Sequence, residues 1–215
     1  MIKLSQYGVR IDGSSLGEGQ GVYESKVLIL VDGISVHSVG AALLWAISTH
    51  GVCATIRPHP KDECNAMGGT DERGVGFVSY TPDQFMRGSS KGCNHANTAG
   101  ADPREILFHE LVHVLRAVSG KWRQGRGGGL RPVYGNDEEF IAMMLTNIYS
   151  SERNRPLRGV YDATFAPLAQ TSQSTVKSAA KILLIEAVKR DHPAMYRRMA
   201  ASSAKYNPLY YYDAL

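Results

Sequence analysis

The strongest local signal in this chain is a helix between Asp102 and Gly120, which constrains the fold because one face of that helix must be buried. Asp102 is a good N-cap residue, Pro103 suits the first helical position and Glu105 stands where a capping box needs it. Gly120 is a natural helix end. Apolar residues follow at helical spacing, namely Ile106, Leu107, Leu111, Val114, Leu115 and Val118. The sequence therefore predicts an amphipathic helix that packs against the rest of the protein.

Three residues of this helix suit metal-dependent hydrolysis: His109, Glu110 and His113. Two histidines four residues apart project from the same face of a helix, so both rings can reach one metal ion. Glu110 is offset around the helix and can activate a water molecule instead of binding the metal. The alternative is an amphipathic helix with ordinary, partly buried histidines. Spacing, context and capping together favour a zinc site.

A catalytic zinc usually has three protein ligands, and one downstream segment suits the third. A helix capped at Asn136 begins with acidic residues, and Glu138 and Glu139 both compete for the role. Glu139 is followed one turn later by Ala142, a small residue that would allow a close approach to the first helix. Glu139 also stands at the capping-box position relative to Asn136, which is the competing explanation. We prefer Glu139 as the ligand.

These motifs carry a family resemblance. His109-Glu110-Leu111-Val112-His113, followed by Glu139-Phe140-Ile141-Ala142, resembles the gluzincin metallopeptidases, and the Glu-Phe-x-Ala pattern is similar to that of lethal-factor-type bacterial toxins. The run over residues 138–152 is similar to metallopeptidase effector domains of bacterial type VI secretion, including the C-terminal domain of certain VgrG spike proteins. Zinc proteases injected by type III secretion are similar in layout. The resemblance covers roughly residues 26–165.

The resemblance implies both a chemistry and a site. His109, His113 and Glu139 would be the zinc ligands and Glu110 the general base of a protease with a zincin-like fold. It also implies a bacterial toxin or effector, with a secretion-spike component and a cognate immunity protein as possible partners. The connection between the two helices is short, which departs from the larger members and leaves little room for their extra elements.

Composition places few limits on this expectation. A chain of 215 residues can bury a sizeable core, and we expect a single metallopeptidase domain over residues 1–215. Its 43% hydrophobic and 20% charged residues are ordinary for a globular protein. No apolar run has the length of a membrane span, and the N-terminus lacks the apolar core of a Sec signal peptide. We expect secretion without a Sec signal and delivery into the periplasm or cytosol of a target cell. A cytosolic protein or an excised domain remains an alternative.

The remaining periodicity predicts an α+β fold with a small mixed sheet and a mostly helical C-terminal part. Short apolar stretches are typical of strands at residues 26–31, 52–57 and 74–80. Helical patterns cover residues 36–49, 174–190 and 193–205, and residues 206–212 form an aromatic tail. By the family resemblance, the stretch 74–80 is our candidate for an edge strand that binds substrate by strand addition. An ordinary structural strand is the alternative.

The three cysteines, Cys53, Cys64 and Cys93, match no Cys-x-x-Cys pattern. Free thiols are the simplest interpretation. A single disulfide between Cys53 and Cys64 is possible if the protein acts in an oxidising compartment. Among the remaining histidines, His95 stands close enough before the helix at 102–120 to merit testing as a ligand.

An oxyanion donor is harder to place from sequence. Tyr134 lies shortly before the third ligand and is our candidate, with Tyr161 and Arg158 as weaker ones. The alternative for Tyr134 is a tyrosine that packs against the second helix. The basic, glycine-rich stretch 123–131 is favoured as a loop near the site over a nucleic-acid segment, because it lacks interleaved aromatic residues.

The sequence therefore predicts a zinc-dependent endopeptidase that acts on a protein or peptide substrate. One alternative is an amidase or endopeptidase acting on peptidoglycan peptides through the same zinc site. Another is a non-catalytic binding module, which the intact Glu110 argues against. A nucleic-acid binder that uses the Gly/Arg loop is the third.

Overall fold

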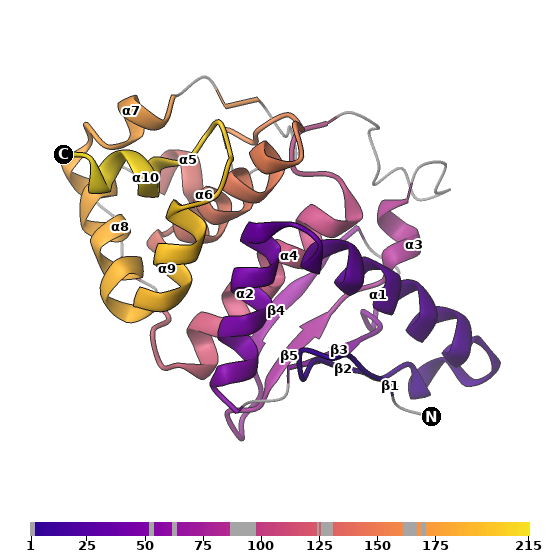
Figure 1. Cartoon of the computed structure of the whole chain (residues 1–215). Helices are drawn as coiled ribbons and strands as arrows, with labels where there is room; N and C mark the ends of the chain where they lie inside the picture. Colours follow the sequence, from indigo (N-terminus) through magenta and orange to yellow (C-terminus); the bar gives the residue numbers. More distant parts are fainter. Residues whose placement is uncertain are drawn as a thin grey trace.

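The computed structural model describes residues 3–51, 54–61, 64–86, 98–123, 125, 131–160, 167–168 and 171–215. Its architecture is α+β, as the sequence predicts, with a small mixed sheet beside a larger set of helices (Figure 1). The strands are β1 (Lys3–Leu4), β2 (Arg10–Ile11), β3 (Thr55–Arg57), β4 (Met67–Thr70) and β5 (Gly76–Ser79).

The helices before residue 120 are η1 (Ser14–Gly19), α1 (Gln20–Ser35), α2 (Ser38–Thr49), α3 (Pro82–Phe85) and α4 (Pro103–Val118). Those after it are α5 (Arg131–Tyr134), α6 (Asp137–Glu152), α7 (Ser172–Thr175), α8 (Ala179–Asp191), α9 (Pro193–Ala200) and α10 (Pro208–Asp213). Figure 1 shows α7 to α10, coloured orange to yellow, gathered on the side of the molecule away from the sheet. Of these, α9 packs against α2.

The sheet has the order β1-β2-β3-β5-β4. β3 pairs in parallel with β2 and β5, and the two outer pairs, β1 with β2 and β4 with β5, are antiparallel. The expectation that residues 74–80 form a substrate-binding edge strand is wrong. Val78 in β5 is opposite Ile56 on one side and Gly68 on the other, so the backbone of β5 is already paired in the sheet. The edge strand on this side is β4, which two glycines disguise in the sequence because glycine is uncommon inside strands.

The expected strand at residues 26–31 is also wrong, because this stretch lies inside α1. Val27, Leu30, Val31 and Ile34 are buried at helical spacing, whereas Ile29 is exposed. A short apolar run alone does not distinguish a buried strand from a helix. The exposure of Ile29 within the run is what a helix produces and what a buried strand would not.

Helix α4 is confirmed with both halves of its capping box, in which the Asp102 side chain accepts from a backbone N–H and Glu105 accepts from the N–H of Asp102. The helix expected at 36–49 is α2, and the strand expected at 52–57 is described as β3. The helix expected at 174–190 is split into α7 and α8, and the next ends at Ala200, not at 205. The aromatic tail contains α10.

Helix α4 lies at the centre of the core. It packs against α1, α2 and α6 and against strands β4 and β5. Leu107, Phe108, Leu111 and Val112 are fully buried. The side chains of His109, Glu110 and His113 are therefore carried by a helix that is packed on several sides.

Two further findings concern the sequence expectations. In the described part of the chain, no single helix is long and apolar enough to cross a membrane, and only the bent pair Ser14–Ser35 and Ser38–Thr49 passes that test jointly. Cys64 is disulfide-bonded, so the free-thiol interpretation is wrong for this residue. Cys53, Cys93 and His95 lie outside the described residues, and the Cys53–Cys64 pairing stays a prediction.

Candidate metal centre

The structure brings together His109, His113 and Glu139, as the sequence predicts. Nε2 of His113 lies 3.0 Å from Nε2 of His109. Oε2 of Glu139 lies 3.1 Å from Nε2 of His109 and 3.4 Å from Nε2 of His113. The two histidines are buried and Glu139 is nearly so. One ligand atom from each residue could therefore hold a single metal ion between α4 and α6.

The electrostatics of these side chains favour a positive charge at this point. Burial alone would lower the pKa of His113, but the carboxylates of Glu138 and Glu139 raise it to about 10. Burial would likewise raise the pKa of Glu139, but hydrogen bonds with His109 and His113 hold it well below its usual range. A protonated His113 ring thus faces the carboxylates of Glu138 and Glu139. A divalent cation can replace that proton.

The backbone at the start of α6 decides between the two interpretations of Glu139. The Asn136 side chain accepts a hydrogen bond from the N–H of Glu139 at 2.9 Å, so Asn136 is the N-cap. The N–H of Asn136 donates to the carbonyl of Tyr134, also at 2.9 Å. The reciprocal half of a capping box would need that N–H for the Glu139 carboxylate. Glu139 therefore does not close the box, and its carboxylate faces the histidines.

The neighbouring Glu138 lies elsewhere. Its carboxylate is fully buried and receives the Nε–H of Arg116 at 2.7 and 2.9 Å. Sequence reasoning weighed Glu138 only as a ligand and missed this ion pair. The available signal was Arg116 itself, a charged residue three positions after His113 in an otherwise apolar part of the helix.

Glu110 follows the first histidine and is buried, and its backbone contacts the edge strand β4 at Gly68. β4 passes so close to α4 that a Cβ atom added to Gly68 would overlap the carbonyl oxygen of Glu110. The glycine therefore permits the close approach of strand and helix at the motif. This contact brings the edge strand β4 against the backbone of Glu110, the residue after His109.

The predicted oxyanion donors lie in different surroundings. Tyr134 ends α5 and packs edge-on against Phe140 at 5.0 Å between ring centroids, with the Lys181 amine 5.5 Å from its ring. Tyr134 thus packs against the second helix, as the alternative interpretation expected. The role of Tyr134 as an oxyanion donor stays a prediction. Arg158 donates to the carbonyl of Val160 and lies next to Asn147, two turns along α6 from Glu139. Tyr161 lies outside the described residues, as does most of the stretch 123–131.

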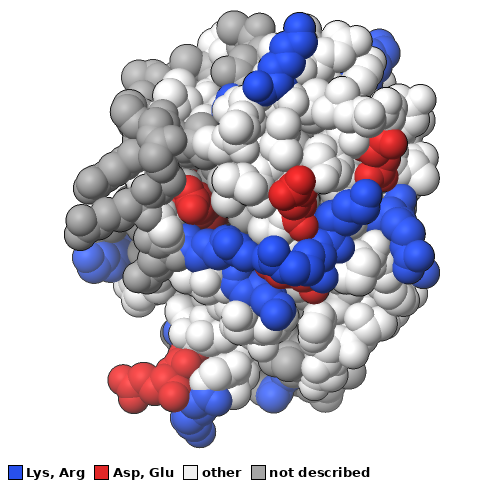
Figure 2. All heavy atoms as spheres, turned by 90° about the vertical axis from the view of Figure 1, so that its left-hand side faces the viewer, with Lys and Arg blue, Asp and Glu red and all other residues white. Residues whose placement is uncertain are grey.

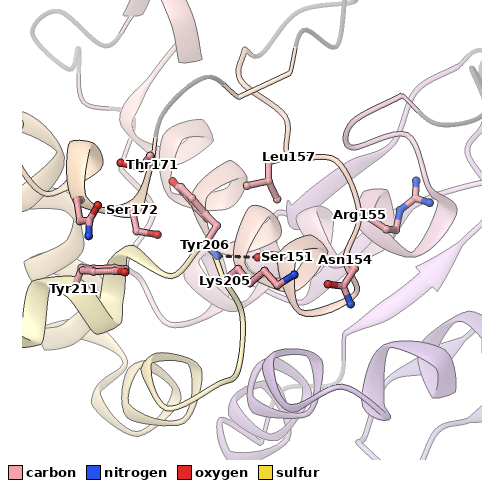
Figure 3. Close-up of a pocket in the computed structure, with 10 residues that line it drawn as sticks. Ser151, Asn154, Arg155, Leu157, Thr171, Ser172, Lys205, Tyr206 and Tyr211 are labelled. Atoms are coloured by element: carbon pink, nitrogen blue, oxygen red, sulfur yellow. Dashed lines mark hydrogen bonds between the residues drawn. The ribbon is translucent and has the colours of Figure 1, made fainter.

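A pocket of about 590 Å³ lies at the other end of α6, away from Glu139 (Figure 3). Ser151 lines it from the end of α6, Arg155 from the segment that follows α6, and Lys205 and Tyr206 from the C-terminal segment. The hydroxyl of Ser151 accepts the N–H of Tyr206 at 2.8 Å, and Arg155 pairs with Glu105 at 2.7 Å. Hydrogen bonds and ion pairs within the protein already occupy much of this polar lining.

The face formed by the C-terminal helices is of mixed charge. Figure 2 shows a band of Lys and Arg side chains there, with acidic side chains between them. Exposed basic residues on α8 and α9 include Lys189, Arg190, Arg197 and Arg198. Lys189 pairs with Asp213 at 2.7 Å and Arg190 with Asp191 at 3.0 Å. Part of the positive charge on this face is thus neutralised within the protein.

Comparison with known proteins identifies no relative: no family model matches the chain, and neither the curated proteins nor the solved structures give a match. The class that fold and site define is an α+β protein with a buried His-His-Glu group able to hold a metal ion.

Proposed function

We propose that this protein is a zinc-dependent endopeptidase. The observation that carries the proposal is the spacing of the three ligand atoms, 3.0, 3.1 and 3.4 Å. Tetrahedral zinc, with ligand distances of about 2.0–2.1 Å, separates its ligand atoms by about 3.3 Å. The donor set of two imidazoles and one carboxylate is also one that catalytic zinc sites use. The residues present therefore suit this metal.

Each side chain has a separate role in the proposed reaction. Zinc held by His109, His113 and Glu139 would supply a Lewis acid that polarises the scissile carbonyl and lowers the pKa of water. Glu110 accepts the proton of the attacking water and passes it to the leaving amine. Tyr134 stays our candidate for the donor to the oxyanion. Burial raises the pKa of Tyr134, so its hydroxyl keeps the proton that a donor needs.

The disulfide at Cys64 supports a place of action outside a reducing cytosol, because disulfides persist in oxidising compartments. Of the two compartments expected from the sequence, the periplasm fits this observation better. By the family resemblance, we propose a bacterial effector, with a secretion-spike component and an immunity protein as partners.

The periplasmic placement favours one second candidate, an enzyme that cleaves peptidoglycan peptides with the same site. The two candidates separate when the zinc-loaded protein is incubated with purified peptidoglycan and with unfolded protein substrates. Release of peptides from peptidoglycan alone would support the second candidate, and cleavage of the proteins alone would support the first.

The proposal is tested by identifying new protein N-termini in cells that contain the active protein, with Glu110→Gln as the matched control. We expect a defined set of new termini in the first sample that is absent from the second. An identical set of termini in both samples would contradict the proposed proteolysis.

A further inference from the structure

We propose that Glu138 is a positioning residue for the metal centre: its buried carboxylate faces Nδ1 of His113 and turns Nε2 of that ring toward the metal. Oε1 of Glu138 lies 3.8 Å from Nδ1 of His113, on the side of the ring away from Glu139; this is longer than a hydrogen bond, and the buried Nδ1 has no hydrogen-bond partner among the described residues, so the negative charge of Glu138 is what acts on it. An imidazole whose Nδ1 faces a carboxylate keeps its hydrogen there and presents Nε2 as the ligand. The inference rests on the proposed zinc site.

The two adjacent glutamates of α6 lie beside different nitrogens of the His113 ring. Glu139 lies beside Nε2, together with His109, and Glu138 lies beside Nδ1. The His113 side chain is 4% exposed and that of Glu138 is fully buried, so water does not substitute for either contact. The ring of Trp122 lies 5.2 Å from that of His113 and further restricts its rotation.

Arg116 holds Glu138 in place. Its Nε–H is shared between the two carboxylate oxygens at 2.7 and 2.9 Å, and its Nη2 donates to the carbonyl of Lys121 at 2.7 Å. The backbone N–H of Arg123 donates to Oε2 of Glu138 at 3.2 Å. A buried carboxylate with this many charge-assisted bonds cannot turn away from the histidine at low cost.

The same arginine connects the carboxylate to a third helix. Nη1 of Arg116 lies 4.0 Å from Oδ2 of Asp191 in α8, and Nη2 of Arg123 lies 3.7 Å from the same oxygen. The buried Arg116 therefore lies between the acids of α6 and α8, and the partly exposed Arg123 reaches Asp191 from the surface. This arrangement suits a fixed support for His113, whereas a third zinc ligand would have to face the metal.

The test compares zinc affinity in the full chain, measured by competition with a chelator, between the wild type and Glu138→Gln. The matched control is Glu105→Gln. Glu105 is also fully buried and pairs with Arg155 at 2.7 Å, but it lies in the first turn of α4, away from the histidines. We expect Glu138→Gln to weaken zinc binding by about 10- to 100-fold, as loss of a ligand's supporting partner does. Glu105→Gln should lose stability without a change in affinity.

The visible absorption spectrum of the cobalt(II)-loaded protein gives a readout that a general loss of stability would not move. We expect the bands of Glu138→Gln to shift as His113 turns, while those of Glu105→Gln stay with the wild type. If Glu138→Gln does not fold, the zinc affinity of Arg116→Lys tests the proposal instead. It keeps a positive charge but loses the hold on both carboxylate oxygens, and we expect it to weaken zinc binding more than Glu105→Gln does.

Two negative results have different meanings. A wild-type protein that binds no zinc would overturn the proposed function, and this inference with it. A wild-type protein that binds zinc, with unchanged affinity and an unchanged cobalt spectrum in Glu138→Gln, would overturn the inference alone. If Glu138→Gln does not fold, an Arg116→Lys variant that matches Glu105→Gln in zinc affinity would overturn it.

Discussion

Nε2 of His109 lies 3.1 Å from Oε2 of Glu139, across the contact between α4 and α6. The candidate metal centre is therefore shared between two helices whose packing is fixed by the core. A metal bound at this point would join the two helices directly, and any change in how they pack would alter the distances between the ligand atoms.

Replacing Glu139 tests which glutamate is the ligand. We predict that Glu139→Gln weakens zinc binding more than Glu138→Gln does, because it removes a donor from the metal. Asp137→Asn, in the same turn of α6, is the control and should leave the affinity unchanged. Chelator competition measures all three variants. Weaker binding in Glu138→Gln than in Glu139→Gln would move the ligand assignment to Glu138.

Replacing Glu110 separates chemistry from metal binding. Glu110→Gln keeps the size of the side chain and removes its basicity, so the variant should fold and hold zinc. Its turnover of a peptide substrate should fall by about two or more orders of magnitude, the range expected for a lost general base. The same change at the exposed Glu72 should have no effect. Full turnover in Glu110→Gln would show that this residue is not the base.

Gly68 tests the close approach of β4 to the motif. An alanine there would overlap the carbonyl oxygen of Glu110, whereas an alanine at Gly69 would meet no atom within 4 Å. We predict that Gly68→Ala lowers the free energy of unfolding by about 1–3 kcal/mol, as overpacking does. We also expect it to lower turnover, because it shifts Glu110. Gly69→Ala should change stability much less. Equal free energies of unfolding for Gly68→Ala and Gly69→Ala, measured with denaturant, would contradict this account of the contact.

Local signals explain why the candidate metal centre was predictable. The caps of α4 and α6 are formed by residues within a few positions of each helix end, so Asp102 and Asn136 mark both helices in the sequence. The spacing of His109 and His113 follows from the helix itself. Once both helices were placed, Glu138 and Glu139 were the choices for the third ligand in the second helix.

The rest depended on tertiary contacts that no local pattern records. The apolar run in α1 fits a strand and a helix equally well in the sequence, and only the exposure of Ile29 in the structure distinguishes them. β4 was hidden because Gly68 is required by the approach to Glu110 and not by strand propensity. The burial of Glu138 depends on Arg116, which lies on a different helix and is separated from it by the stretch between α4 and α6.

His192, beside the Arg116 and Asp191 pair, makes stability depend on pH. Burial, aided by the positive charge of Arg116, lowers the pKa of His192 to about 4, and its Nε2 has no hydrogen-bond partner among the described residues. Between pH 4 and 6.5 the unfolded chain therefore binds more protons at this residue than the folded chain does, and stability falls as the pH falls.

We predict that the loss of stability between pH 7 and pH 5 is smaller by about 2 kcal/mol in His192→Leu than in the wild type, because the leucine has no proton to gain. Urea unfolding at the two pH values measures the difference. His59→Leu, at a partly exposed histidine, serves as the control and should lose as much stability as the wild type between the two pH values. An equal loss in the wild type and in His192→Leu would contradict the buried, neutral state of His192.

The zinc content of the purified protein tests the central claim most directly. Elemental analysis after dialysis should find one zinc per chain in the wild type, and none above background in His109→Ala or His113→Ala, because each change removes one of three ligands. X-ray absorption at the zinc edge should show nitrogen and oxygen neighbours at about 2.0–2.1 Å. Full zinc occupancy in either histidine variant, or a wild-type protein that takes up no zinc when the metal is supplied, would contradict the account.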